Sequence, residues 1–271
     1  MNYQQYEVRQ PLNSFVKCFW SLEAPASPIP EKQRIVPDGC MEMIFNYGDR
    51  YQQFFEDGSS LIQPQCFVFG QITVPLEIVP TGTTGIIAAR FHPDGFQPFS
   101  PLTIQEMTNR AVPLYELFGE EAMILEKNIV EGADATERIK HLSEFLVSKL
   151  KSPEAFNRVT KSGIEALLQS KGQINVDKLT EQLQINRRQL ERSFAAAIGL
   201  SPKKLSKVIR LQTAVKMLGE KKYSSLTALA YENGYFDQAH FIKEFKEFTG
   251  VSPKQFYDGN LKMSTLFTSM D

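Results

Sequence analysis

Apolar positions follow two different periods along this chain of 271 residues. Between residues 34 and 91, β-branched and aromatic residues come in short runs, separated by Asp-Gly, Thr-Gly and Pro-Asp-Gly turn signals. Runs punctuated in this way predict β-strands that form a small sandwich or barrel. The residues expected in its core are Phe45, Phe67, Phe69, Ile87 and Phe91.

After Phe99 the apolar spacing changes toward the helical period of 3.6 residues. Residues 120–130 and 135–151 predict amphipathic helices. In the second of these, one stripe carries Ile139, Leu142, Phe145, Leu146 and Leu150. Such a stripe packs most often on its own domain, and the alternative is a helix pair that forms dimer contacts.

The C-terminal part of the chain has helical apolar spacing nearly throughout. Helices are predicted at 157–170, 176–183, 187–197, 203–219, 225–233 and 238–248, with Pro at several starts and Gly past several ends. Pro153 breaks the helical pattern and marks a domain boundary. We therefore expect an α+β, multidomain chain: a β-rich domain with C-terminal helices at 1–152, an all-α domain at 156–257, and a flexible tail at 258–271.

The same short sequence motif occurs twice in the helical region, and the two copies are offset by 51 residues. The matched pairs are Asn186 with Asp237, Leu190 with Phe241, Phe194 with Phe245, and Gly199 with Gly250. Asn186 and Asp237 each follow a tight turn and are typical N-caps; Gln189 completes a capping box, and Gly234 is expected to take a positive φ. Two short helices joined by a turn, with the second one capped, predict a helix-turn-helix.

The second helix of each copy of the motif has a polar face that suits the major groove of DNA. The spacing of three or four residues turns Leu190, Phe194 and Ile198, and likewise Phe241, Phe245 and Phe248, toward the core. The outward residues are then Arg187, Arg188, Glu191 and Arg192 in one helix and Gln238, Ala239, Ile242, Lys243 and Lys246 in the other. Arg pairs with guanine, Gln with adenine, Glu with cytosine and an apolar side chain with the thymine methyl. Ordinary solvated helix faces are the alternative interpretation.

Two such units on one chain could read two successive turns of double-stranded DNA, because half-sites lie about 34 Å apart. The helix predicted from Lys203 to Leu218 would be the rigid spacer between them. The two copies of the motif therefore match two successive turns of the major groove.

Residues 156–257 resemble the DNA-binding domain of the AraC/XylS family of bacterial transcription regulators. The resemblance rests on "LERSF" and "IGLSP" within 190–202, "RLQTAVKML" at 210–218 and "GYFDQAHFIKEFKEFTGVSP" at 234–253. It implies that the helices after Asn186 and Asp237 enter adjacent major grooves. The base-facing candidates it implies are Arg188, Glu191, Arg192, Gln238, Ala239, His240, Ile242 and Lys243.

Some residues depart from the family pattern. Ala239 replaces a commonly polar residue, and "FYDG" stands where the family often has an Arg, so one phosphate contact is in question. His240 falls at the third position of its helix, where a local backbone bond competes with a DNA contact.

Regulators of this family usually carry a β-rich companion domain that binds an effector or mediates dimerisation. The segments "RIVPDGCMEMIFNYGD", "FHPDGFQPF" and "EMTNRAV" resemble such companions, which implies a cupin-like domain. Effector-binding candidates are Arg34, Asp38, Glu42 and Arg90, because a charge set in apolar strands needs a partner; structural ion pairs or turn caps are the alternative. We expect no metal and no cofactor, since only His92 lies in the β region.

The charge is divided between the two halves of the chain. Residues 1–154 carry 12 Lys and Arg against 20 Asp and Glu, a net charge of −8, whereas residues 155–257 carry 17 against 9, a net charge of +8. Such asymmetry favours a polyanion-binding module attached to an acidic partner domain. Three scattered cysteines, Cys18, Cys40 and Cys66, suit a reducing compartment, and neither a signal peptide nor a membrane-spanning run is expected.

Three classes of function follow, and the first is preferred. It is a cytoplasmic, sequence-specific transcription regulator, activator or repressor, that acts as a homodimer, is gated by a small molecule, and has RNA polymerase as a further candidate partner. The second is a non-specific architectural DNA-binding protein, although the low overall charge speaks against it. The third is an enzyme that would use Cys66, His92 and Asp94; no geometry is predicted for this set, so we expect no catalytic activity.

Overall fold

The computed structural model describes residues 1–150 and 158–258. The predicted domain boundary near Pro153 and the predicted tail beyond 258 lie outside the described residues. Ten strands and two 3-10 turns build most of the first 113 residues: β1 (Asn2–Tyr6), η1 (Leu12–Ser14), β2 (Val16–Ala24), β3 (Gln33–Ile35), β4 (Glu42–Asn46), β5 (Tyr51–Phe54), β6 (Ser60–Ile62), β7 (Cys66–Phe69), β8 (Leu76–Pro80), β9 (Thr84–Phe91), η2 (Ile104–Met107) and β10 (Ala111–Pro113).

The strands form two antiparallel sheets. The larger sheet has the order β1-β2-β9-β4-β7-β10, and the smaller one has the order β3-β8-β5-β6. Apolar side chains of both sheets meet between them, among them Trp20, Phe67 and Ile78. This interior is the core of the predicted sandwich or barrel.

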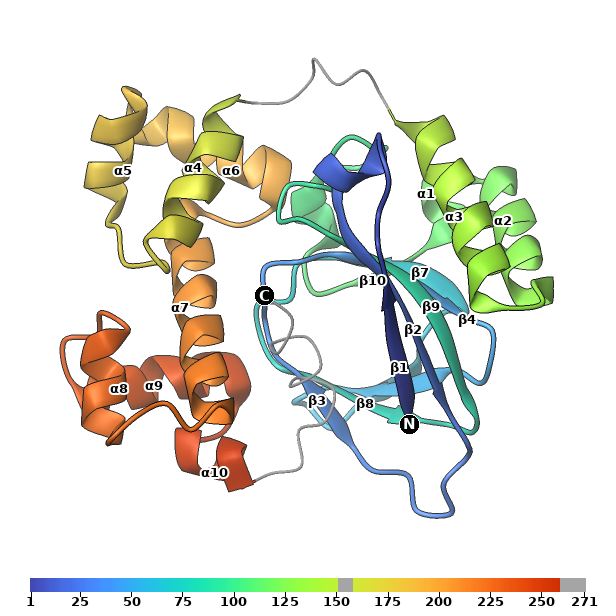
Figure 1. Cartoon of the computed structure of the whole chain (residues 1–271), viewed down its shortest axis with the longest axis horizontal. Helices are drawn as coiled ribbons and strands as arrows, with labels where there is room; N and C mark the ends of the chain where they lie inside the picture. The colour runs from blue at the N-terminus through green and yellow to red at the C-terminus, as the bar shows by residue number, and fades with distance from the viewer. Residues whose placement is uncertain (151–157, 259–271) are drawn as a thin grey trace.

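The other face of the larger sheet is covered by helices. These are α1 (Leu114–Phe118), α2 (Glu120–Glu131) and α3 (Ala135–Lys149) (Figure 1). Side chains alternate between the two faces of a strand, so Ile87 and Phe91 of β9 pack under the helices, whereas Ile86 and Ala88 face the second sheet. All eight residues of β9 are buried, because both of its faces are covered.

The predicted core residues are buried, on both sides of the larger sheet. Phe45, Ile87 and Phe91 belong to the helix side and Phe67 and Phe69 to the interior. In the helical stripe, Leu142 and Leu146 are fully buried against the sheet, and Ile139, Phe145 and Leu150 are partly buried against the same cluster. The stripe therefore packs on its own domain.

The C-terminal helices agree with the predicted segments to within one or two residues. They are α4 (Arg158–Gln169), α5 (Val176–Leu183), α6 (Arg187–Ile198), α7 (Pro202–Gly219), α8 (Leu226–Glu232), α9 (Gln238–Thr249) and α10 (Pro253–Asp258). α4–α6 lie at one end of α7, and α8–α10 lie at the other (Figure 1). With 18 residues, α7 is about 27 Å long. It is the expected spacer, since Leu205 joins the core around α6 and Leu211 joins the core around α9.

The two domains touch through a turn that we call the docking turn, Val36–Cys40. Val36 is only 3% exposed and lies within the hydrophobic core around α9. The Gln212 amide of α7 donates a hydrogen bond to the Pro37 carbonyl at 2.6 Å. Gly39 has a φ of +80° and passes so close to Leu205 that a Cβ there would lie 3.1 Å from its side chain. Both the positive φ and this close approach favour glycine at this position of the turn.

The β-rich domain also meets the C-terminal ends of α6 and α9 at equivalent places. Gly199, which follows α6, lies against the backbone of Ile104 in η2. The carbonyl of Thr249, the last residue of α9, accepts a hydrogen bond from Arg34 at 3.3 Å. These contacts leave the N-terminal turns of α6 and α9 uncovered, with both Arg188 and Ala239 exposed.

Candidate functional site

The two halves of the repeat have the same local geometry. The Asn186 side chain accepts a hydrogen bond from the Gln189 backbone at 2.8 Å, and the Asp237 side chain accepts one from the His240 backbone at 2.7 Å. Both helices have 12 residues, and they end at Gly199 and Gly250 with φ of 78° and 73°. The predicted caps and glycine ends are confirmed, as is the positive φ of Gly234, at 72°. Of the capping box at Asn186, only this bond occurs among the hydrogen bonds of the described residues.

The outward face of α6 is charged and open. Arg188, Glu191 and Arg192 are exposed, as the apolar spacing predicts. Arg187 donates a hydrogen bond from Nε to Glu191 at 3.0 Å, one helical turn further on. A fully exposed pair of this kind contributes little to stability, so DNA could displace it readily.

The outward face of α9 is more varied. Ala239, His240 and Lys243 are exposed, whereas Gln238 is half-buried, with its side-chain oxygen accepting a bond from the Thr227 hydroxyl at 2.7 Å. Ile242 differs from the prediction, because it is only half-exposed and packs against the core. It directly follows the buried Phe241 and therefore borders the apolar stripe.

A buried ion cluster fixes α9 against the spacer helix. Glu244 of α9 is 3% exposed and accepts a bond from Arg210 of α7 at 2.9 Å; Lys207 lies 3.2 Å from its other oxygen. Burial alone would raise the pKa of Glu244, but the bonds and charges of Arg210 and Lys207 hold it below its ordinary value. This ion cluster therefore holds α9 in one orientation relative to α7.

One exposed aromatic residue was missed at the sequence level. Phe236 is 84% exposed and directly precedes the N-cap Asp237. It was read only as part of the turn before α9. Its place between a buried Tyr235 and the cap, outside the apolar stripe of either helix, is the signal that could have identified it.

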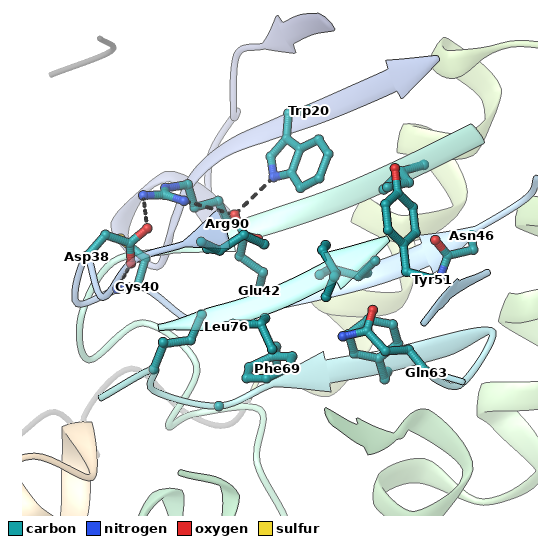
Figure 2. Close-up of a pocket in the computed structure, with 17 residues that line it drawn as sticks. Trp20, Asp38, Cys40, Glu42, Asn46, Tyr51, Gln63, Phe69, Leu76 and Arg90 are labelled. Atoms are coloured by element: carbon teal, nitrogen blue, oxygen red, sulfur yellow. Dashed lines mark hydrogen bonds and ion pairs between the residues drawn. The ribbon is translucent and has the colours of Figure 1, made fainter. Parts of the chain in front are cut away.

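A second candidate site is a cavity of about 40 Å³ between the two sheets of the β-rich domain. At one end Arg90, only 5% exposed, donates hydrogen bonds to Asp38 at 2.6 Å and to Glu42 at 2.9 Å (Figure 2). The Trp20 indole also donates to Glu42, at 3.2 Å. Three of the four effector-binding candidates thus meet in one cluster, in which they are also ion-paired with each other.

In this cluster, burial and the neighbouring charges shift the pKa values in opposite directions. Burial raises the pKa of Glu42 above its ordinary value, although the nearby Arg90 works against this. Burial also disfavours the charged form of Arg90, but Asp38 and its neighbours hold the pKa of Arg90 well above the ordinary value. Arg90 is therefore a permanent cation between two carboxylates.

Arg34, the fourth effector-binding candidate, lies outside this cavity. It pairs with Glu77 of β8 and reaches the end of α9. Conversely, Trp20 and Cys40 line the cavity and were not predicted, and neither were Asn46, Tyr51 and Gln63 at its other end (Figure 2). Strand alternation was the available signal, since Glu42 and Asn46 occupy one face of β4.

The residues of the alternative enzyme hypothesis are not brought together. Cys66 is buried in the helix-side core, where burial raises the pKa of its thiol. His92 and Asp94 line a separate cleft that faces Lys161 of α4. Within 1–150 and 158–258, no three His, Cys, Asp or Glu residues are grouped as metal ligands would be. In the same part of the chain, every helix is too short or too polar to span a bilayer.

Comparisons with known proteins give one family match for the helical domain and another for the β-rich domain. Residues 179–258 match the family described as "Helix-turn-helix domain", and residues 4–113 match a "Domain of unknown function (DUF6597)". The first match covers α6 and α9, and the second covers nearly all of the two sheets.

Two curated sequences are similar to part of the chain. An "Uncharacterized HTH-type transcriptional regulator" of Haemophilus influenzae is 34% identical over 99 residues, which are 36% of this chain and 33% of that protein. The "HTH-type transcriptional regulator MtrA" of Neisseria gonorrhoeae is 37% identical over 82 residues, 30% of this chain and 27% of that one. The similarity thus spans about a third of each relative. Among solved structures, ToxT from Vibrio cholerae aligns over 89% of this chain and 98% of its own, with 12% identity and a TM-score of 0.48.

Proposed function

We propose that this chain, whose residues 179–258 form an AraC-type helix-turn-helix domain, is a sequence-specific DNA-binding regulator of transcription that reads two successive segments of the major groove. The observation that carries the proposal is the repeat of a helix with the same cap, length and glycine end, α6 and α9, at the two ends of one spacer helix. A single unit would fit many roles, but two units at the two ends of one spacer helix suit adjacent groove segments.

The exposed side chains of α6 and α9 suit different kinds of contact with DNA. Arg188 and Arg192 have the fork that pairs with guanine, and Glu191 accepts from cytosine. On α9, Lys243 and the free N-terminal amides suit phosphates, which position the protein without reading sequence. Phe236, beside these amides, offers an apolar surface for a sugar or a thymine methyl.

The proposal includes gating by a small molecule through the docking turn. The middle residue of this turn, Asp38, is ion-paired with Arg90 at the cavity, and its first residue, Val36, is buried in the core around α9. A ligand that prefers one arrangement of Asp38 would shift the population of domain arrangements and hence the placement of α6 and α9.

Replacing Gln212 with alanine is expected to weaken the link between the domains. The lost bond to Pro37 is worth about 0.5–1.5 kcal/mol. Trp20, the only tryptophan, reports unfolding of the β-rich domain by fluorescence, and helical circular dichroism reports mainly the C-terminal domain. In urea the two curves should coincide for the natural chain and separate for Gln212→Ala. Coincident curves for the variant would contradict the role of this bond; Gln182→Ala on exposed α5 is the control.

The cellular location of the regulator and its protein partners can also be proposed. We propose a homodimer in the cytoplasm, with RNA polymerase as a partner at the promoter. The support for dimerisation is the outer face of α2, where Met123 and Ile124 are 58% and 62% exposed. Large apolar side chains side by side on a surface are typical of interaction sites.

The proposal is tested by selection of duplexes from a random DNA library with the purified full chain at near-physiological salt. We expect enrichment of a motif with two blocks about one helical turn apart, bound at least about 10³ times more tightly than unrelated DNA. Salt-sensitive binding without an enriched motif would contradict sequence reading and favour an architectural DNA-binding protein.

A further inference from the structure

We infer that the cavity of the β-rich domain binds a small protonated amine, whose N–H groups donate hydrogen bonds to the Glu42 carboxylate. The inference rests on the proposed gating function, and it specifies the chemical class of the effector. Its support is the geometry of the charged cluster, the lining of the cavity and its size.

The charged end of the cavity favours a cation over an anion. Its lining includes the two carboxylates of Asp38 and Glu42 but only one guanidinium, that of Arg90. Both terminal nitrogens of Arg90 already donate to these carboxylates. An anionic ligand would have to break one of these buried bonds and then face the remaining negative charge, which is costly in a poorly solvated site.

Glu42 has one oxygen available for such a cation. Its Oε1 accepts from both Trp20 and Arg90, at 3.2 and 2.9 Å. Within 1–150 and 158–258, its Oε2 takes part in no hydrogen bond. This oxygen can accept hydrogen bonds from an ammonium group, which supplies three donors and a compensating charge.

The remaining lining suits the apolar part of such a ligand. Ile44, Phe67 and Ile86 also line the cavity. The Trp20 indole lies beside Glu42 (Figure 2). Aromatic faces attract cations as well as alkyl groups, most strongly when water is excluded. One water molecule needs about 10–15 Å³ of such internal space, so the cavity of about 40 Å³ accommodates about three water-sized groups. The ligand is therefore an amine with one or two carbon atoms.

Binding at this place would reach the docking turn directly. A second cation beside Glu42 competes with Arg90 for the same carboxylate. Arg90 is also the group that holds Asp38, and the Asp38 carboxylate in turn accepts a bond from the Cys40 backbone at 2.8 Å. The amine thus acts on the residue that shapes the turn between cavity and α7.

The test is a titration of the full chain followed by Trp20 fluorescence, because the only tryptophan of the chain lines the cavity. The probes are ethylammonium chloride, ethanol and sodium acetate at equal ionic strength and pH 7. We expect a saturable change with ethylammonium alone. Saturation by acetate, or by all three probes alike, or by none of them would overturn the inference.

A variant assigns the binding to Glu42. Glu42→Gln keeps the shape and an acceptor for Trp20 and Arg90, and we expect it to weaken ethylammonium binding at least ten-fold; Glu116→Gln on the exposed surface of α1 is the control. Equal binding by Glu42→Gln would overturn the inference, and the probe series on the natural chain decides it independently if this variant folds poorly. Failure of these titrations together with successful DNA selection would reject the amine alone, whereas amine binding without DNA selectivity would reject the proposed regulator.

Discussion

Replacing Arg90 with alanine is expected to lower the free energy of unfolding of the β-rich domain by about 3–5 kcal/mol. The side chain is 5% exposed, and its removal leaves the carboxylates of Asp38 and Glu42 close together without a counter-charge. The loss of one partner from a buried ion pair costs far more than the pair contributes, because the remaining charge stays desolvated. Urea denaturation followed by Trp20 fluorescence measures the effect.

Two matched variants sharpen this result. Arg90→Lys keeps the charge but cannot bridge two carboxylates with a planar fork, so its stability should lie between that of the natural chain and Arg90→Ala. Arg9→Ala, which removes an exposed arginine from the same domain, should have little effect. A change below about 1 kcal/mol for Arg90→Ala would show that the cluster is well solvated, which would contradict the buried ion cluster described above.

Replacing Arg192 with alanine is expected to lower the affinity for a selected DNA duplex about 10- to 100-fold and to relax the preference at one base pair. The residue is exposed on α6, one turn beyond Arg188, and a two-pronged contact with guanine is worth about 1–3 kcal/mol. Binding to unrelated DNA should change much less. The measurement is a set of binding isotherms on the selected duplex and on its single-base variants.

The control is Lys140→Ala on α3, which removes an exposed positive charge from the other domain. It should leave both affinity and preference unchanged. If Arg192→Ala weakened all duplexes by the same factor, Arg192 would be a phosphate contact, and base reading by the first unit would be wrong.

The helix-turn-helix units were predictable because their signals are local. A cap such as Asp237, a glycine such as Gly250 and the apolar spacing between them all lie within 14 residues, and the second copy repeated the signal of the first. The β-rich domain was predicted in less detail, because strand pairing depends on distant residues. β1 and β2 lie before the predicted region and were missed, although β2 pairs with β9 along nearly its whole length.

The same difference between local signals and contacts of distant residues applies to the candidate sites. The cluster of Asp38, Glu42 and Arg90 was anticipated because buried charges require partners. The docking turn was not, since its Pro-Asp-Gly sequence reads as an ordinary turn signal. Its decisive bond joins Pro37 to Gln212, 175 residues away. Side chains whose role depends on such contacts carry no periodic signal.

The central claim is that α6 and α9 read one duplex at the same time, on the same face. The most direct measurement is the affinity of the full chain for the selected duplex with five base pairs inserted between its two blocks. The insertion rotates the second block by about half a turn, so that a spacer helix of fixed length cannot present both recognition helices to their blocks. We expect the affinity to fall to that of a duplex that retains only one block, whereas unchanged affinity would contradict simultaneous reading by the two units.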